Sequence, residues 1–438
     1  MTPPAGSIVK NGSRGWSVAG PVLVMGILAG SALRVVLLPT QGLQGDLDQF
    51  AFWIGEIARN GLGPTYDMNL SFPPVMVYIF GLLGAVVPGA TSAIDSSDPL
   101  LRAAIKIPAS LADLGLALGV AWLLRDRPRW AVVAALGVLL LPAVWYTSAW
   151  WGQFESIYVL LGLLAAILAV AGRPRWSALL LAIAVMTKPQ ALPFLVPFGA
   201  WYLGRYGLRR SLELAAIGLA TAVVLWLPFI PYAGPQNYLA NLAEYQNGIF
   251  AVLSLRAWNF WWLIQQPISG ADFLNDQGAI FGPVTPRMIG LAITGLLMLI
   301  VGAAVYRRPS SRGLLLGLAC AVLVSFSFLT TMHERYVYGA LVFLAPLIPD
   351  RRVLVLWLVL AVTASLNIVA AVPATDWIAT NLPIDGPIGM LCSLGTVGVT
   401  LATLWLLVRE SAEPDGSAAA ARPAAPHEPG ADAPASPA

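Results

Sequence analysis

The sequence predicts an all-α membrane protein that crosses the bilayer about twelve times, with both termini in the cytoplasm. The 438-residue chain is 58% hydrophobic and only 11% charged. Apolar runs of about twenty residues recur along it, which is the length that an α-helix needs to cross the hydrocarbon layer. Short basic segments separate these runs, and the spacing leaves room for two crossings between neighbouring segments. We therefore expect one multi-span domain over residues 16–408.

The composition also excludes several classes of protein. The net charge of +3 is too small, and its charges too scattered, for a nucleic-acid-binding surface. Cys320 and Cys392 both lie inside apolar runs, so we expect no disulfide. The histidines are His333 and His427, and the sequence shows no cluster with the spacing of metal ligands.

The first apolar run, residues 16–38, follows Lys10 and Arg14 and so resembles a signal peptide. It is too long for a typical signal core and many further spans follow, so we interpret it as an uncleaved first helix. Residues 1–15 would then form a cytoplasmic N-terminal segment. At the other end, residues 409–438 are rich in Ala, Pro, Gly and acidic residues, which predicts a disordered cytoplasmic tail.

Orientation follows from the positive-inside rule, because cytoplasmic loops carry the excess of Lys and Arg. The basic connections are RDRPR (125–129), RPR (173–175), RYGLRR (205–210), RRPSSR (307–312) and Arg351–Arg352. The opposite, outer face then receives WWGQFES (150–156), TKPQ (187–190), a long loop over 232–286, HERY (333–336) and residues 373–386.

The loop over residues 39–99 contains one more apolar run, residues 71–88, for which this parity leaves no crossing. The run is short for a span and opens with a Pro-Pro pair, which cannot continue a helix backwards. We interpret it as a juxtamembrane helix on the outer face. The alternative is a true span combined with an inverted N-terminus.

The same loop begins with QGDLDQFAFW, whose apolar residues recur at helical spacing and predict an amphipathic helix. Asp46 has two interpretations. It could be an N-cap, with Gln49 closing a capping box. Alternatively, the helix end presents a carboxylate, Asp46 or Asp48, to a cleft on the outer face.

Cationic residues converge on the outer face from three segments. Arg102, Lys106 and Asp113 share one helix face, so Lys106 could either pair with Asp113 or bind a phosphate. Lys188 could be a loop lysine that extends to the membrane surface, or part of an anion site. HERY is either a turn with an interfacial ion pair or, through His333 and Arg335, a part of the same cationic cleft.

WWGQFES has a similar ambiguity. An interfacial aromatic belt and a helix cap explain Trp150, Trp151 and Ser156, but they explain Glu155 less well.

Five segments in order, GDLDQFAFW, SFPPVMVY, LPAVWYTSAWWGQFESIY, TKPQALPFLVP and MHERYVYGALVFLAP, resemble the integral-membrane GT-C glycosyltransferases. In particular they resemble bacterial relatives of the GPI-anchor mannosyltransferases and the family 87 polyprenyl-phosphomannose-dependent enzymes. The resemblance covers residues 46–346. It implies a GT-C fold with juxtamembrane helices in the first outer loop.

The resemblance also implies roles for individual residues. The first-loop aspartate of the family falls on Asp46, as a catalytic base. The Trp-Gly-Gln-x-Asp motif falls on residues 151–155, with Glu155 in place of Asp. The Asp-Tyr-Pro-Pro motif falls on residues 71–74, where Ser71 and Phe72 replace the first two residues.

The implied activity is inverting transfer of a sugar, most simply mannose, from a polyprenyl phosphate to a glycan, lipid or protein at the outer face of the cell membrane. Cations that meet the departing phosphate stabilise the transition state more than the ground state, so no metal and no cofactor are required. The expected phosphate ligands are Arg335, Lys188, Lys106 and His333. The expected sugar or acceptor ligands are Asp48, Gln153, Glu155, Gln190, Glu334 and Tyr336.

Two other functions fit a polytopic protein. A transporter or flippase of a lipid-linked saccharide would place polar residues at the membrane midplane, whereas here they gather at one face. A structural or assembly subunit would not need a cationic cluster.

Overall fold

The computed structural model describes residues 9–413, so most of the predicted tail and the first eight residues lie outside the described part. Helices of the main bundle are α1 (Val9–Leu37), α4 (Pro99–Leu123), α5 (Pro128–Leu139), α6 (Pro142–Trp145), α7 (Glu155–Val170), α8 (Pro174–Val185), α9 (Leu195–Trp226), α12 (Pro286–Arg307), α13 (Ser311–Phe328), α14 (Tyr338–Leu344), α15 (Arg351–Ala371) and α17 (Pro387–Ala412). The last helix therefore continues four residues past the predicted domain limit at 408.

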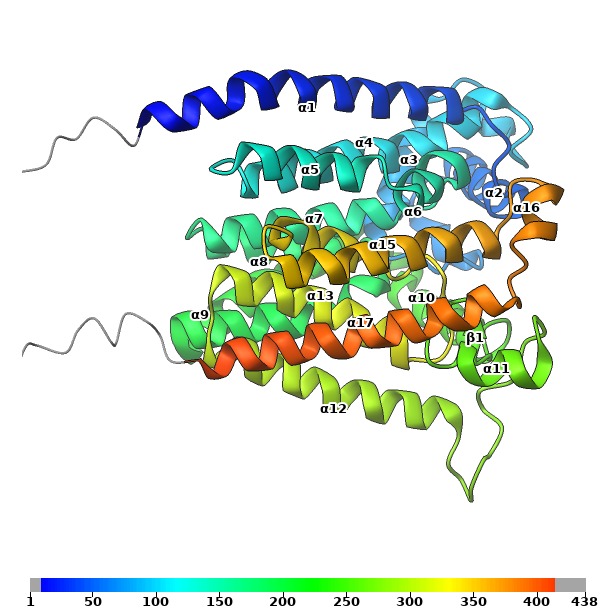
Figure 1. Ribbon diagram of the computed structural model, residues 1–438. Helices are drawn as coiled ribbons and strands as arrows, with labels where there is room; N and C mark the ends of the chain where they lie inside the picture. The colour runs from blue at the N-terminus through cyan, green and yellow to red at the C-terminus, as the bar shows by residue number, and fades with distance from the viewer. Residues whose placement is uncertain (1–8, 414–438) are drawn as a thin grey trace, which may run out of the picture.

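Shorter elements gather at one end of this bundle, on the right of Figure 1. They are α2 (Gln44–Asn60), α3 (Pro74–Val86), α10 (Gly234–Asn247), α11 (Trp262–Ser269), α16 (Asp376–Asn381) and the two-residue parallel strands β1 (Ser254–Leu255) and β2 (Met332–His333). We call this the loop end. Short turns of helix join the elements: η1 (Gly63–Asp67), η2 (Ala90–Ser92), η3 (Tyr146–Trp151, a π-helix), η4 (Pro189–Phe194), η5 (Leu227–Tyr232) and η6 (Ala345–Leu347).

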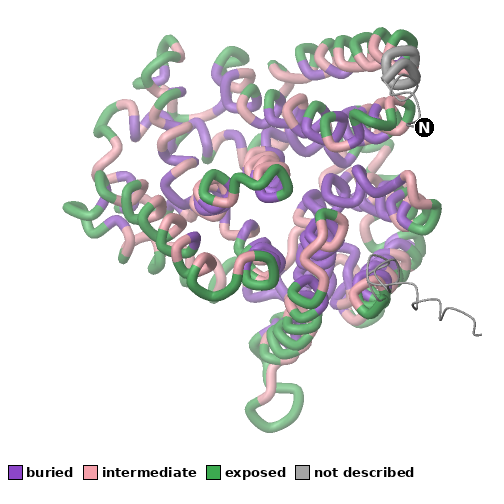
Figure 2. Tube along the Cα trace, turned by 90° about the vertical axis from the view of Figure 1, so that its left-hand side faces the viewer, coloured by how far each residue is buried: buried purple, intermediate pink, exposed green. Residues whose placement is uncertain are grey.

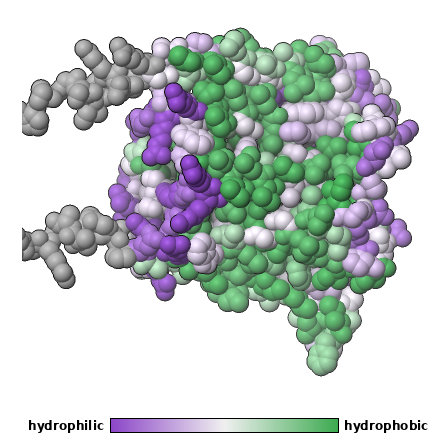
Figure 3. Space-filling view, in the orientation of Figure 1, coloured by the Kyte–Doolittle hydropathy of each residue, from purple (hydrophilic) through white to green (hydrophobic). Residues whose placement is uncertain are grey.

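The opposite end, on the left of Figure 1, is where α1 begins and α17 ends, and we call it the basic end. Trp16 donates a hydrogen bond to the carbonyl of Arg125, the first residue of the RDRPR connection, at 2.9 Å. Arg312 pairs with Asp350 at 2.7 Å and with Glu410 at 2.8 Å. Figure 3 shows hydrophilic residues at this end and a broad hydrophobic band beside it. The basic connections therefore meet at one end, as the positive-inside argument requires.

Helix α9 is two helices that reverse direction at Gly207, whose φ of 73° and ψ of 176° are not helical. Before the reversal, Gly204 lies against the backbone of Tyr306 at the end of α12. After it, Glu213 pairs with Arg175 at the start of α8, at 2.8 Å. The chain therefore runs to the basic end and returns within this one element.

Seven described helices are long and apolar enough to cross a membrane, or eight if the bent pair over residues 128–151 counts as one span. Shorter apolar helices fill other parts of the bundle, among them α7 and α8. The nearly all-α membrane class is confirmed. The number of about twelve spans stays a prediction, because several of these helices fall short of the length of a span.

The first long loop, residues 39–99, leaves and re-enters the bundle at the same end. Arg102, in the first turn of α4, donates to the carbonyl of Pro39 at 3.0 Å, just beyond the end of α1. Between these points lies α3, with 13 residues, and a single further crossing would have left the two ends of the loop at opposite ends of the bundle. Helix α3 packs on α2 around Phe50 and Phe80, in a hydrophobic cluster that the start of α4 also joins through Ile105. The juxtamembrane interpretation therefore fits the structure better than a further span.

Viewed from the basic end, buried residues of the bundle face inward and exposed ones outward (Figure 2). A buried ion pair joins α1 to α4 in this interior, where Arg34 bonds to Asp113 at 2.7 Å. Asp113 also accepts hydrogen bonds from Ser148 and, at 2.7 Å, from Tyr338. The partner of Asp113 is therefore Arg34 and not Lys106, the residue that the shared helix face had indicated.

Candidate active site

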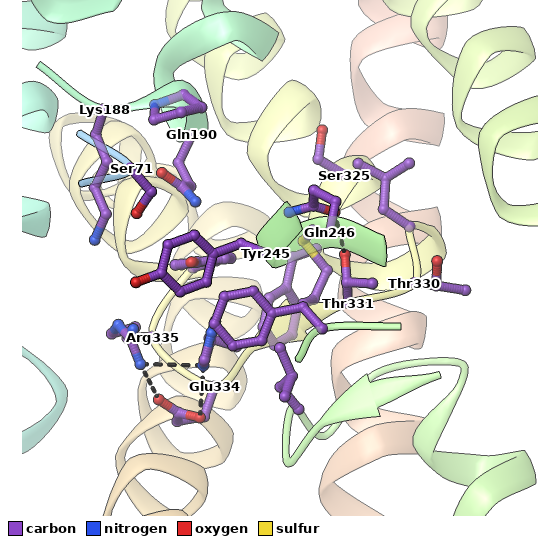
Figure 4. A pocket seen from close by; sticks show the side chains of 18 of the residues that line it. Ser71, Lys188, Gln190, Tyr245, Gln246, Ser325, Thr330, Thr331, Glu334 and Arg335 are labelled. Carbon is purple, nitrogen blue, oxygen red and sulfur yellow. Dashed lines mark hydrogen bonds and ion pairs between the residues drawn. The ribbon is translucent and has the colours of Figure 1, made fainter. Parts of the chain in front are cut away.

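A cavity of about 980 Å³ opens at the loop end. Its walls come from α2, η4, α10, α12, α13, the β1–β2 pair and the HERY segment, so residues far apart in sequence meet there. Figure 4 shows Lys188, Glu334 and Arg335 on one side of this cavity. Hydroxyl and amide side chains, including Ser325 and Gln246, lie on the other side.

Asp46 lines the cavity from the first turn of α2. The helix begins at Gln44 after an N-cap residue that makes no side-chain hydrogen bond, and Gln49 donates to the hydroxyl of Tyr245 at 3.0 Å. The capping-box interpretation of Asp46 is therefore wrong. Its Oδ2 instead accepts hydrogen bonds from Trp151 Nε1 at 2.9 Å and Gln153 Nε2 at 2.6 Å.

A tight turn places these two donors. The π-helix η3 ends at Trp151, and Gly152 follows with φ of 97°, a conformation that side chains other than glycine rarely adopt. A Cβ on Gly152 would lie 2.7 Å from Leu47 Cδ2. Trp151 is 2% exposed, so it is not part of an interfacial belt. Its position next to Asp46 was the feature that the belt interpretation missed.

The charged side of the cavity is a group of paired residues. Glu155, the first residue of α7, is fully buried and forms ion pairs with Lys188 and with Arg335 Nε, the latter at 3.3 Å. Arg335 Nη1 donates to Glu334 Oε1 at 2.9 Å and to His333 Nδ1 at 3.2 Å. Each predicted phosphate-binding cation of the cavity therefore already has a carboxylate partner.

Aromatic rings enclose the same cations. The guanidinium carbon of Arg335 lies 4.7 Å from the ring centroid of Trp151. Lys188 Nζ lies 5.5 Å from the ring of Tyr336 and 5.8 Å from that of Phe72. At these distances the ring faces attract the charges. Phe72, one of the two residues that depart from the family motif, thus contributes a ring to the site.

Burial shifts the titration of the groups in the loops that line the cavity. It lowers the pKa of His333 well below its ordinary value, and the positive charges of Arg335 and Lys188 lower it further. Burial also lowers the pKa of Lys188, against the opposing effect of Glu155, and raises the pKa of Glu334, against that of Arg335. His333 is therefore neutral at neutral pH and adds no positive charge to the site.

Lys106 does not reach the cavity. Its ammonium donates to the carbonyl oxygens of Thr40 at 2.7 Å and Leu37 at 3.4 Å, at the C-terminal end of α1. A cation in that position satisfies the free carbonyls of a helix terminus. The structure therefore removes Lys106 from the predicted phosphate ligands and gives it a structural role.

Two of the predicted sugar ligands also lie outside the cavity lining. Asp48 accepts hydrogen bonds from the Ser96 backbone at 2.9 Å and from its hydroxyl at 2.5 Å, and so ties α2 to the end of the first loop. Glu155 lies behind Lys188 and Arg335, where it holds the cations and has no access to a sugar.

The other predicted residues line the cavity: Gln153, Lys188, Gln190, His333, Glu334, Arg335 and Tyr336. Gln190 Oε1 is buried and has no hydrogen-bond partner among the described residues. It can therefore accept a hydrogen bond from a hydroxyl group of a ligand.

The sequence analysis missed the contribution of the second long loop and of the helices that flank it. These lining residues are Tyr245, Gln246, Arg256, Arg287, Thr294, Ser325, Thr330 and Thr331. The signal that could have found part of the set is charge, because Arg256 and Arg287 stand on the face opposite the basic connections. Within residues 9–413, no group of three or more His, Cys, Asp or Glu residues is arranged to hold a metal ion.

A helical membrane bundle with a carboxylate and paired cations in one cavity at its end fits the GT-C class of glycosyltransferases. The family model described as the ALG6, ALG8 glycosyltransferase family matches residues 111–372, more than half of the chain. The chain belongs to this family, and its resemblance to GT-C enzymes is confirmed.

Similar proteins include one curated relative and one solved structure. One, from Drosophila melanogaster, is described as a probable dolichyl pyrophosphate Man9GlcNAc2 alpha-1,3-glucosyltransferase and is 26% identical over 198 residues. That match covers 42% of this chain and 39% of the relative, so the chain spans about two fifths of its length. The other is the crystal structure of ArnT from Cupriavidus metallidurans bound to undecaprenyl phosphate, with 17% identity and a TM-score of 0.47. It covers 89% of this chain, and the chain covers 77% of it.

Proposed function

We propose that the protein is an inverting glycosyltransferase that moves a hexose from a polyprenyl phosphate to a hydroxyl group of an acceptor. The observation that carries this proposal is the arrangement of Asp46. Its carboxylate is held by Trp151 and Gln153 in the wall of the same cavity that Lys188 and Arg335 line. Asp46 can accept a proton there, and Lys188 and Arg335 can bind a phosphate.

The cavity also has an apolar part that suits a polyprenyl chain. It is lined between η4, α9, α12 and α13 by Leu192, Val196, Leu291, Met298 and Val322. Leu192 and Leu291 are 51% and 58% exposed on the surface of the bundle. Through this part, the polyprenyl chain of a donor can remain in the bilayer while its phosphate reaches the loop end.

The reaction follows from the charges of its participants. The acceptor hydroxyl oxygen attacks the anomeric carbon, and Asp46 takes the hydroxyl proton as general base. The bond between the anomeric carbon and the phosphate oxygen breaks, and its electron pair stays on the phosphate, which gains a second negative charge. The carbon centre passes through an oxocarbenium-like transition state, and attack from the face opposite the phosphate inverts its configuration.

The cations act on the leaving group. Lys188 and Arg335 lie in the cavity wall in fixed positions, because Glu155 holds both and Glu334 holds Arg335. Preorganised charges of this kind stabilise a developing anion without reorganisation during the reaction. Gln153, Gln190 and Tyr336 then remain to bind hydroxyl groups of the sugar or acceptor, and this mechanism requires no metal ion.

The donor sugar and the side of the membrane are also part of the proposal. The sequence predicted mannose, whereas the Drosophila relative is described as a glucosyltransferase, so we treat mannose and glucose as competing donors. We place the reaction at the outer face of the cell membrane, because the basic connections meet at the opposite end of the bundle. The charged lining at the loop end also supports an enzyme over a transporter with polar groups at the midplane.

The test is a transfer assay with the full chain in nanodiscs, radiolabelled polyprenyl-phosphate mannose or glucose, and cell membranes as the source of acceptor. We expect transfer from one of the two donors. Asp46→Asn should lower turnover by about 10²- to 10⁴-fold, the usual contribution of a general base, while the binding of polyprenyl phosphate persists.

Asp48→Asn is the matched control, because Asp48 lies two residues away in the same helix and outside the cavity lining. It should keep most of the activity. An Asp46→Asn variant with more than about a tenth of wild-type turnover would refute the role of Asp46 as base. An inactive Asp48→Asn beside an active Asp46→Asn would show that the base was assigned to the wrong carboxylate.

A further inference from the structure

The part of the cavity around Lys188 and Arg335, which we call its inner part, has no excess of positive charge. Lys188 and Arg335 stand beside three carboxylates, those of Asp46, Glu155 and Glu334. A phosphate that leaves the sugar gains a second negative charge, and a compensated group of this kind offers it little net attraction. A further cation in the cavity wall would supply what this group lacks.

Among the described residues that line the cavity, three other side chains could carry a positive charge: His333, Arg287 and Arg256. His333 is neutral for the reasons given above. Arg287 forms a two-pronged ion pair with Asp276, at 2.8 and 2.9 Å. Arg256 has no carboxylate partner in the described part of the chain, and its one side-chain hydrogen bond goes from Nη1 to the carbonyl of Ala371 at 3.0 Å.

The backbone at Arg256 is strained and is held in place. Its φ of 61° lies in the left-handed region, which residues other than glycine rarely occupy. Asn367, which is 2% exposed in α15, donates from Nδ2 to the Arg256 carbonyl at 2.8 Å. The Oδ1 of Asn367 accepts from the Trp258 backbone at 3.0 Å. Strain of this kind persists where the surrounding structure fixes it, and it is concentrated at functional sites.

Strand pairing places Arg256 close to His333 and Arg335. Leu255 is paired with His333 across β1 and β2, and Arg256 itself forms an isolated bridge with His333. Adjacent strands lie about 4.8 Å apart, and Arg335 follows His333 by two residues. The side chain of Arg256 is exposed in the cavity wall, so its free N–H groups can reach a ligand that also contacts Arg335.

We propose that Arg256 binds the phosphate of the lipid-linked donor and stabilises it as it leaves, and that Asn367 is the positioning residue for Arg256. This inference rests on the proposed function, because that function supplies the phosphate. The planar guanidinium can give two parallel hydrogen bonds to phosphate oxygens, which an ammonium group cannot.

A purely structural role for Arg256 is the competing explanation. Its bond to Ala371 lies at the C-terminal end of α15, where a cation satisfies free carbonyls and stabilises the helix. The two roles differ in what they affect. A helix cap contributes to stability, whereas a phosphate ligand contributes to the affinity for polyprenyl phosphate in a fully folded protein.

The test measures the binding of undecaprenyl phosphate to the full chain in nanodiscs, together with thermal unfolding. Arg256→Gly removes the guanidinium and leaves a residue that adopts the left-handed backbone without strain. Its matched control is Ala233→Gly, which puts glycine at another left-handed position, with φ of 52°, away from the cavity lining. We expect Arg256→Gly to weaken binding by about 10- to 100-fold, the range for a lost hydrogen bond to a charged group, and Ala233→Gly to leave it unchanged.

Arg256→Lys should fall between the wild type and Arg256→Gly, because it keeps the charge and loses the fork. Asn367→Ala should also weaken binding, but it should add little in the Arg256→Gly background if it acts through Arg256. Unchanged phosphate affinity in a folded Arg256→Gly protein would overturn the inference. Because this readout needs no sugar transfer, it separates the inference from the proposed function, which fails if the wild type transfers neither sugar.

Discussion

Glu155→Gln tests whether the buried glutamate keeps the two cations of the site charged and in place. Glu155 is fully buried and pairs with both Lys188 and Arg335. Glutamine has nearly the same shape and keeps one oxygen that accepts hydrogen bonds, so the substitution removes a charge and little volume. The outcome therefore reports on electrostatics more than on packing.

The magnitude follows from the geometry of the pair. At the 3.3 Å between Arg335 Nε and Glu155 Oε1, two unit charges attract by about 5 kcal/mol if the effective dielectric constant is about 20. Desolvation offsets part of this attraction in the intact protein. Removing one member of a buried pair typically lowers the free energy of unfolding by about 3–5 kcal/mol, because the remaining charge is left buried without compensation. We expect the lower part of that range, because Glu334 still pairs with Arg335.

Turnover should also change its dependence on pH. Burial lowers the pKa of Lys188 and the charge of Arg335 lowers it further, whereas Glu155 raises it. Without Glu155 the pKa of Lys188 falls again. The ammonium is present below its pKa and lost above it, so the alkaline decline of turnover should begin at a lower pH in the variant than in the wild type.

The assay compares turnover against pH for the wild type, Glu155→Gln and Lys188→Met, together with thermal unfolding of each protein in nanodiscs. Lys188→Met has no ammonium to titrate and serves as the control for the alkaline limb. A Glu155→Gln protein with wild-type stability and an unshifted alkaline limb would refute this account of the pair.

Two further predictions concern Lys106 and the orientation of the chain. Lys106→Met should lower the thermal stability, because the carbonyls of Leu37 and Thr40 lose their donor. It should leave the affinity for polyprenyl phosphate unchanged. A loss of that affinity in a variant of wild-type stability would show that Lys106 does bind the phosphate. Phe281→Cys, at a position that is 84% exposed at the loop end, should react with an impermeant maleimide added outside intact cells, whereas Arg127→Cys at the basic end should not. The reverse labelling pattern would invert the proposed topology.

Much of the architecture could be predicted because few physical rules decide it. The apolar runs and basic connections predicted a helical bundle with all basic segments at one end, and the parity of crossings identified residues 71–88 as a short helix of the first loop. The number of spans is harder to predict. The reversal at Gly207 falls within the predicted connection RYGLRR, but helices as short as α8 cannot be recognised as spans by length alone.

The site was predictable where chemistry is carried by residue type, and less so where it depends on partners. Asp46, Lys188 and Arg335 do meet in one cavity. Lys106 was assigned to it because helical periodicity shows which residues share a face but not which neighbouring helix that face meets. Glu155 was assigned to the sugar because its two partners are distant in the sequence. Lys188 lies 33 residues away along the chain, and Arg335 lies much farther away.

The compensation of the inner cations explains how such a site can exist within a membrane protein. Two bare cations buried next to each other would be costly whenever no donor is bound, and glutamates at 155 and 334 remove that cost. The same glutamates reduce the attraction that the inner group can offer to a phosphate. A cation without a carboxylate partner at the exposed wall resolves this conflict, because water solvates it before the donor binds. We therefore assign orientation of the leaving phosphate to Arg335 and Lys188, and net attraction to Arg256.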